Sequence, residues 1–326
     1  MRRFLATQTV LWILLSSGTV LAEIEQSEVL FTSGDVELAG TVFTPFGEGP
    51  FPAIVLVHGS GPGERSEYLS IATRFAGEGM VVLIYDKRGS GHSGGNWITS
   101  SLTDLAEDAA AALRFLVDQP KIDSQRSGYW GISQGGWIVP LAANMSYPAF
   151  AIVVSGGGLT PKEVESVRYR SIVRHANGSQ ADVDKAESLV ESYFDYLGGL
   201  ISYETLQQKI EPVKTESWFD AMGIGNVIPG PENRSNWEWV ATFDPKESIE
   251  ELAMPILVFL GGIDPLTPAG DAARAWRAAL SPDIQQNRVV VFQDAGHGMR
   301  TGAHGGDYAE GYFSTQFDWL RAIGVL

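Results

Sequence analysis

Short, nearly unbroken runs of apolar residues recur along the chain and restrict the folds open to it. They read AIVLV at 53–57, MVVLI at 80–84, FAIVV at 150–154 and PILVFL at 255–260. A strand with one face in water alternates apolar and polar residues, whereas a strand covered on both faces is apolar throughout. These runs therefore predict the central strands of a parallel sheet between two layers of helices.

Helical patterns fill most of the gaps between the strands. Ser101 and Asp104 form a capping-box pattern that opens a helix over Leu102–Val117. The predicted strands are Glu28–Thr32, Val36–Phe43, Ala53–Val57, Met80–Tyr85, Ser127–Trp130, Phe150–Val154, Pro255–Leu260 and Arg288–Phe292. The other predicted core helices are Ser66–Glu78, Gln134–Asn144, Ala269–Leu280 and Tyr308–Ala322. This alternation predicts an α/β fold with an eight-stranded, mostly parallel sheet, and the first two strands form an antiparallel hairpin at its edge.

The interval 158–250 departs from this alternation. It contains helical patterns over Glu163–His175, Asp182–Leu197 and Tyr203–Glu211, and the remainder is rich in Gly, Pro and Trp. We expect a mainly helical cap there, inserted into a core made of 23–157 and 251–326. Its aromatic residues could line an acyl pocket or simply pack the cap; they are Tyr193, Phe194, Trp218, Phe219, Trp237 and Trp239.

The first residues have the pattern of a secretory signal peptide. Arg2 and Arg3 precede the apolar stretch Val10–Leu15, and small residues end at Ala22. We expect cleavage after residue 22, a secreted or periplasmic protein and no stable membrane insertion afterwards. The alternative is a retained anchor, because the uncharged stretch Phe4–Ala22 is nearly long enough to span a bilayer.

Composition excludes several classes of protein. The net charge is -16 and no cluster of five or six Lys or Arg occurs, so we expect no nucleic-acid partner. The chain has no Cys, which rules out disulfide scaffolds, thiolate metal sites and a cysteine nucleophile.

The strongest chemical signal is the segment Gly131–Gly136, GISQGG, between a predicted strand and a predicted helix. This is the nucleophile-elbow pattern: a tight turn needs small residues two before and two after Ser133, and it exposes the Ser133 hydroxyl above the sheet. Ser133 is therefore the candidate nucleophile.

A serine hydroxyl needs a base, and the chain contains five His. His297 follows the last predicted strand, where a loop can bring its imidazole over Ser133, and it is the candidate base. His304 is the rival, while His92 lies in another loop and His175 in the predicted cap.

The base in turn needs a carboxylate to orient it. Asp264 follows the strand at 255–260 and would emerge at the same sheet edge as His297. Asp294 competes, but it precedes His297 by only three residues and would have to curl back. The chain order is then Ser133, Asp264, His297, which is the order of one serine-hydrolase architecture.

An oxyanion hole needs two backbone donors. The Gln134 N–H follows from the elbow, and the loop His58–Gly63, HGSGPG, offers the Ser60 N–H, with Gly61 as the alternative. We expect His58 to be structural and to bond the backbone of its own loop.

Together these segments resemble the α/β-hydrolase superfamily, and within it bacterial serine carboxylesterases with a helical cap. The likeness covers HGSGPG, GISQGG, GGIDPLTP and DAGHG, and YDKRGSGHS at 85–93 looks like an architectural turn of the family, so Asp86 is not the candidate acid. A serine at the elbow differs from the aspartate of the related dehalogenases and epoxide hydrolases.

The resemblance implies a serine hydrolase that cleaves small to medium carboxylic esters through an acyl-enzyme, with neither cofactor nor metal. An aminopeptidase or prolyl-type peptidase on the same fold is the alternative. It would need acidic residues in the cap, or an extra domain, to hold the substrate amine, and the candidate residues are Glu163, Glu165, Glu187 and Glu191. A non-catalytic binding protein on a hydrolase scaffold is a third possibility.

Overall fold

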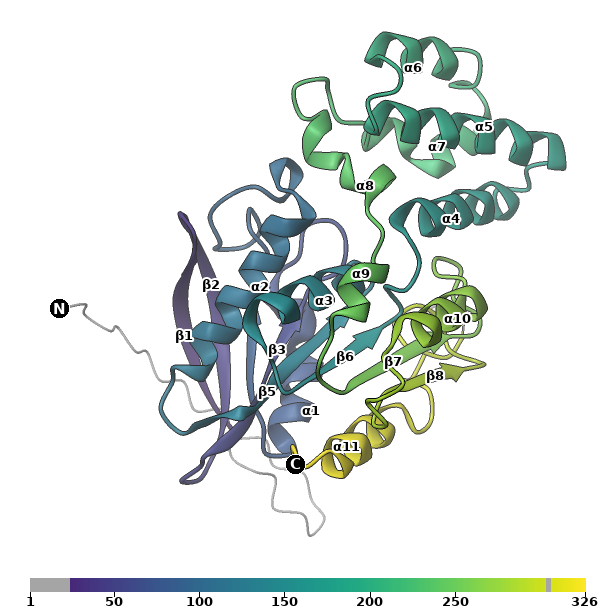
Figure 1. Cartoon of the computed structure of the whole chain (residues 1–326). Coiled ribbons are helices and arrows are strands. Elements are labelled where there is room, and N and C mark those ends of the chain that lie inside the picture. Colours follow the sequence, from purple (N-terminus) through teal and green to yellow (C-terminus); the bar gives the residue numbers. More distant parts are fainter. Residues whose placement is uncertain (1–23, 303–305) are drawn as a thin grey trace.

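A computed structural model describes residues 24–302 and 306–326 (Figure 1). An eight-stranded sheet with the order β1-β2-β4-β3-β5-β6-β7-β8 forms its centre. The strands are β1 (Ile24–Ser33), β2 (Val36–Pro45), β3 (Phe51–Val57), β4 (Val81–Tyr85), β5 (Ile122–Ile132), β6 (Phe150–Val154), β7 (Ile256–Gly261) and β8 (Arg288–Phe292). β1 and β2 pair antiparallel at one edge, and β3 to β8 run parallel, as predicted.

Helices cover both faces of the sheet, which explains why its central strands are apolar throughout. On β3, Val55 belongs to one buried cluster with residues of α2, α3 and α10, while Ile54 and Leu56 belong to another with residues of α1 and α11. These helices are α1 (Leu69–Gly77), α2 (Leu102–Val117), α3 (Gly135–Ser146), α10 (Ala269–Ala279) and α11 (Tyr312–Ala322).

Two core helices are shorter than the sequence pattern predicts. The segment from Arg65 to Tyr68 is a 3-10 turn that precedes α1. α11 begins only at Tyr312, because Gly311 has a φ of 81° and Tyr308 pairs with Arg300 in an isolated bridge. The left-handed residue breaks the helical path of the backbone.

Between β6 and β7 the chain forms a separate group of helices with a buried cluster of its own. They are α4 (Pro161–His175), α5 (Gln180–Leu197), α6 (Tyr203–Ile210), α7 (Ser217–Met222) and α8 (Trp239–Thr242), drawn together beyond one end of the sheet in Figure 1. A further helix, α9 (Lys246–Glu250), packs on α3 and α10, and its Ile249 belongs to the core cluster. We call α4 to α8 the helical segment.

None of the helices in the described part of the chain is long and apolar enough to span a membrane. The predicted signal peptide, residues 1–22, lies outside the described residues.

Candidate active site

Ser133 occupies the sharp turn between β5 and α3. Its φ is 57°, in the left-handed region, and its carbonyl accepts the Gly136 N–H at 2.8 Å. An L-residue adopts such a conformation only where its surroundings enforce it. The Ser133 side chain is partly exposed at the carboxyl edge of the sheet.

Glycines make this turn possible because other segments press against it. A Cβ at Gly131 would lie 2.7 Å from a Val139 methyl group, and one at Gly156 would lie 1.9 Å from the Ser133 carbonyl oxygen. The elbow is thus held between α3 and the loop after β6, and only a residue without a side chain fits at either contact.

The loop after β3 lies directly against the elbow. A Cβ built on Gly59 would be 3.3 Å from the Ser133 Cβ and 3.9 Å from its Oγ. Ser60 on this loop and Gln134 at the elbow line one common pocket at this edge of the sheet. Gln134 is the N-cap of α3, so its backbone N–H stands at the positive end of that helix.

Asp264 and His297 meet at the ends of β7 and β8. The Nδ1 of His297 lies 2.8 Å from the Asp264 Oδ2. The other carboxylate oxygen, Oδ1, accepts the Leu266 N–H at 2.8 Å and the Thr267 N–H at 3.1 Å. The Asp264 side chain is buried, and about a quarter of the His297 side chain is exposed. Such a pair keeps the proton on Nδ1 and leaves Nε2 to accept one.

The three candidate residues thus follow β5, β7 and β8 at one sheet edge. Among the hydrogen bonds of residues 24–302 and 306–326 there is none between Ser133 and His297. Catalytic hydrogen bonds of this kind often tighten only when substrate is bound.

The competing residues take other positions. Asp294 is exposed, as are His92 and His175, and the Nδ1 of His175 bonds the Ser171 carbonyl on α4. His304 lies outside the described residues. Asp86 accepts the backbone N–H groups of Arg65 and His92, and so holds the turn after β4.

His58 is structural, but its partner differs from the expectation. Its Nε2 bonds the Tyr85 carbonyl at the end of β4 rather than the backbone of its own loop. Burial lowers the pKa of His58 to about 4, so the imidazole is neutral and its Nε2–H donates to that carbonyl. The bond joins the loop after β3 to the neighbouring strand.

A pocket of about 190 Å³ lies between the sheet edge and the helical segment. Trp97 and Trp137 of the core line it together with Tyr169, Tyr193, Trp237 and Trp239 of the region after β6. The other cap aromatics behave differently: Phe194 and Trp218 are buried in the cluster of the helical segment, with Phe219 packed against it. The aromatic residues of this segment are therefore divided between the pocket and the packing.

Charged residues also line this pocket, namely Lys87, Glu165 and Arg168. Glu165 forms an ion pair with Arg168 at 2.6 Å, and Glu187 pairs with Arg170 at 3.1 Å. Glu163 accepts the Thr160 N–H in a capping box at the start of α4.

The structure places Lys87, which is not among the residues predicted from the sequence, beside the elbow. Its side chain is almost fully buried, and its Nζ donates to the Gly59 carbonyl at 2.9 Å, the Gly61 carbonyl at 3.0 Å and the Gln134 Oε1 at 2.8 Å. The signal was present in YDKRG, because a lysine two residues after the end of a buried strand lies at the same edge as the other candidate residues.

The fold and the geometry of this site define an α/β hydrolase. Residues 33–293 match the model of the X-Pro dipeptidyl-peptidase (S15) family. The chain belongs to that family.

Individual relatives match more weakly or over shorter stretches. The quorum-quenching protein AidA of Acinetobacter baumannii is 36% identical over 36% of this chain and 39% of its own length. Esterase EstD of Thermotoga maritima is 24% identical over 81% of this chain and 58% of its own length. The chain thus spans roughly half the length of these curated relatives.

Solved structures share the fold. Acetyl xylan esterase 1 from Thermoanaerobacterium superposes with a TM-score of 0.57 and 17% identity, over 98% of this chain and 88% of its own. At this identity the likeness concerns the fold alone.

Proposed function

We propose that this protein is a serine hydrolase that cleaves carboxylic esters of small to medium acyl groups through an acyl-enzyme intermediate. The observation that carries the proposal is that three structures lie at the carboxyl edge of one parallel sheet: the strained Ser133 elbow, the loop of Gly59 and Ser60 against it, and the Asp264–His297 pair. Membership of a hydrolase family and the names of EstD and acetyl xylan esterase 1 support it.

In the proposed mechanism, Ser133 Oγ attacks the ester carbonyl while His297 Nε2 takes its proton. Asp264 holds His297 by Nδ1 and stabilises the imidazolium that forms. The Ser60 and Gln134 N–H groups receive the oxyanion. The imidazolium then protonates the leaving alkoxide. Water attacks the acyl-enzyme with His297 again as base, the bond between the acyl carbon and Ser133 Oγ breaks, and the imidazolium returns the proton to Oγ as the acid leaves.

The charges of the pocket favour an ester over a peptide substrate. A peptidase that trims the amino terminus must hold an ammonium group, yet Lys87 and Arg168 line this pocket. Among the described lining residues the one carboxylate is Glu165, and it is already paired with Arg168. Among the other candidate carboxylates, Glu163 caps a helix and Glu187 pairs with Arg170.

The family name nevertheless supports a second candidate, a peptidase acting on Xaa-Pro substrates. Purified protein should therefore be assayed on p-nitrophenyl acetate and on an Xaa-Pro p-nitroanilide. We expect a much higher kcat/KM for the ester; faster cleavage of the anilide would establish the peptidase instead.

The nucleophile is tested by Ser133→Ala. Loss of a member of such a triad lowers turnover by roughly 10⁴- to 10⁶-fold, and we expect a loss of that order on p-nitrophenyl acetate. Near-normal activity in the variant would refute the assignment of Ser133.

We also propose that the helical segment caps the site and that residues 1–22 direct export to the periplasm or the medium. The pocket between the segment and the sheet edge supports the first proposal, and the pattern of Arg2, Arg3 and Val10–Leu15 supports the second. N-terminal sequencing of exported protein should begin at Glu23. A chain that starts at Met1 and sediments with membranes would instead indicate a retained anchor.

A further inference from the structure

Lys87 is a buried cation whose hydrogen-bond acceptors, within the described residues, are all neutral oxygens, and its Nζ also lies 5.8 Å from the centroid of the Trp97 ring. Its three ammonium hydrogens match its three acceptors, which are the Gly59 and Gly61 carbonyls and the Gln134 side chain. No carboxylate in the described part of the chain lies within ion-pair distance of its Nζ. Burying an unpaired cation is costly, so its retention beside the candidate nucleophile calls for a role.

The bond to Gly59 orients the Ser60 N–H. The Gly59 carbonyl and the Ser60 N–H belong to one planar trans peptide unit and point to opposite sides of it. Lys87 holds the carbonyl from one side and so directs the N–H to the other. The same loop lies against Ser133, since a Cβ on Gly59 would be 3.3 Å from the Ser133 Cβ.

The bond to Gln134 reaches the other half of the proposed oxyanion hole. Gln134 stands at the start of α3, and its side-chain oxygen accepts from Lys87 at 2.8 Å. One ammonium group therefore ties the loop after β3 to the N-cap residue of α3, and these two segments carry the two proposed oxyanion donors.

Resting on the esterase mechanism proposed above, we propose that Lys87 is a positioning residue of this reaction. It holds the backbone N–H groups of Ser60 and Gln134 in a fixed relative orientation, with its positive charge on the opposite side of the Gly59–Ser60 peptide from the oxyanion.

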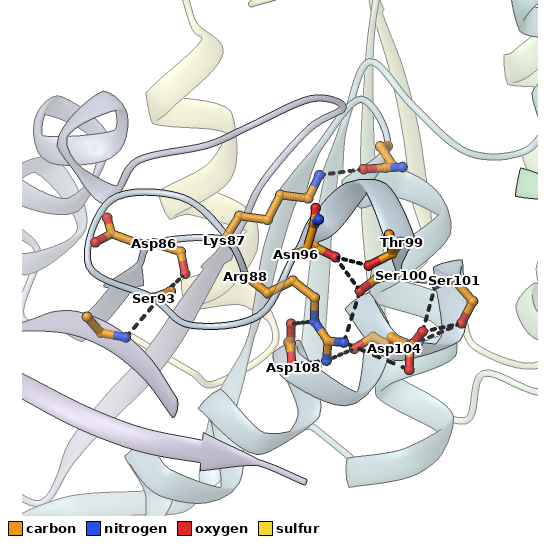
Figure 2. Close-up of polar contacts among 12 residues, drawn as sticks. Asp86, Lys87, Arg88, Ser93, Asn96, Thr99, Ser100, Ser101, Asp104 and Asp108 are labelled. Carbon is orange, nitrogen blue, oxygen red and sulfur yellow. Dashed lines mark hydrogen bonds and ion pairs between the residues drawn. The ribbon is translucent and has the colours of Figure 1, made fainter. Parts of the chain in front are cut away.

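Neighbouring residues fix the turn of the backbone that carries Lys87. The next residue, Arg88, extends to α2, where its Nε and Nη2 each lie 2.6 Å from a carboxylate oxygen of the buried Asp108 (Figure 2). In the same turn the Ser93 hydroxyl donates to the Asp86 carbonyl at 2.6 Å. Arg88 thus fixes the turn to the core, while Lys87 reaches into the site.

The charge of Lys87 depends on pH near neutrality. Burial lowers the pKa of Lys87 to about 7, and Asp108 on α2 opposes this effect. The other ionisable groups around it are neutral His58 on the β3 loop and the paired Glu165 and Arg168 of α4, which line the same pocket. Above about pH 7, Lys87 loses its charge and one of its three donors.

The test compares Lys87→Met with the control Lys209→Met, which removes one charge from an exposed position on α6. We expect Lys87→Met to lower kcat on p-nitrophenyl acetate by roughly 10- to 100-fold while KM changes less than about threefold, because an aligned donor contributes to the transition state alone. The rate of Ser133 labelling by a fluorophosphonate should fall in proportion. Lys209→Met should match the wild type in all three readouts.

The pH profile separates positioning from a purely structural effect. The kcat/KM of the wild type should decline on the alkaline side as Lys87 deprotonates, and Lys87→Met should lack this decline. If Lys87→Met does not fold, Gln134→Leu removes one acceptor, keeps the backbone N–H and should lower kcat roughly three- to tenfold.

The inference is overturned if Lys87→Met equals Lys209→Met in kcat and keeps the alkaline decline, or, where Lys87→Met is unfolded, if Gln134→Leu equals the wild type. The proposed function fails separately, through a wild type that does not hydrolyse the ester or a Ser133→Ala variant that does.

Discussion

The two oxygens of the Asp264 carboxylate have different partners. Oδ1 accepts two backbone N–H groups, and Oδ2 bonds His297. Because the backbone fixes the carboxylate, the carboxylate can fix the imidazole. Asp264→Asn should therefore favour the wrong tautomer of His297 and lower kcat by roughly 10³- to 10⁴-fold.

The matched control for this change is Asp294→Asn, since Asp294 is exposed and precedes His297 by three residues. We expect its esterase activity to stay within about twofold of the wild type. A large loss in Asp294→Asn with little loss in Asp264→Asn would reverse the assignment of the acid.

For single residues, position along the chain predicted part of the site. Asp264 and His297 each follow a strand, and parallel strands bring such residues to one edge, so their contact could be expected from order alone. The role of Lys87 could not, because it depends on where the oxygens of Gly59, Gly61 and Gln134 lie in space. No spacing in the sequence encodes that convergence.

The elbow as an element depends on the loop after β6. A Cβ on Gly156 would lie 1.9 Å from the Ser133 carbonyl oxygen, so Gly156→Ala must displace the elbow. Overpacking of this kind costs about 1 to 3 kcal/mol. We expect a lower Tm together with a loss of esterase activity larger than the loss of folded protein.

Gly77→Ala is the control, because nothing lies within 4 Å of a Cβ at the end of α1. It should leave activity unchanged and keep the Tm within a few degrees. Full activity in Gly156→Ala would show that the elbow does not need this contact.

The boundaries of helices and strands could be predicted where a local sequence signal marks them. α2 begins and ends where its capping box and apolar period indicate, with both capping-box bonds formed. The helix predicted from Tyr308 begins only at Tyr312, because Tyr308 pairs with Arg300 in a tertiary contact that overrides the helical pattern. The longer course of β5, from Ile122, likewise depends on pairing with β3.

In the whole molecule, the pocket lies between two separately packed bodies, the sheet core and the helical segment. Trp239 of α8 lines the pocket and contacts Trp137 of α3, with ring centroids 6.2 Å apart. Trp239→Phe should enlarge the space for the acyl chain. We expect the ratio of kcat/KM for the hexanoate ester over the acetate ester to rise roughly 3- to 10-fold.

Trp218→Phe makes the same chemical change inside the cluster of the helical segment, where Trp218 is fully buried. It should lower stability by about 1 to 3 kcal/mol and leave the ester ratio unchanged. An equal shift of the ester ratio in both variants would mean that the helical segment affects specificity through its stability and not through the side chains that line the pocket. The sequence indicated that aromatic residues gather in this segment, but their division between lining and packing arises only from the fold.

The central claim is that Ser133 is an activated nucleophile at this sheet edge. Its most direct test is to treat the wild-type protein with a fluorophosphonate and map the modified peptide by mass spectrometry. We expect one phosphonate per chain, on Ser133, with esterase activity lost in step with labelling, and no labelling of Ser133→Ala. An unmodified protein, or a phosphonate on another residue, would contradict it.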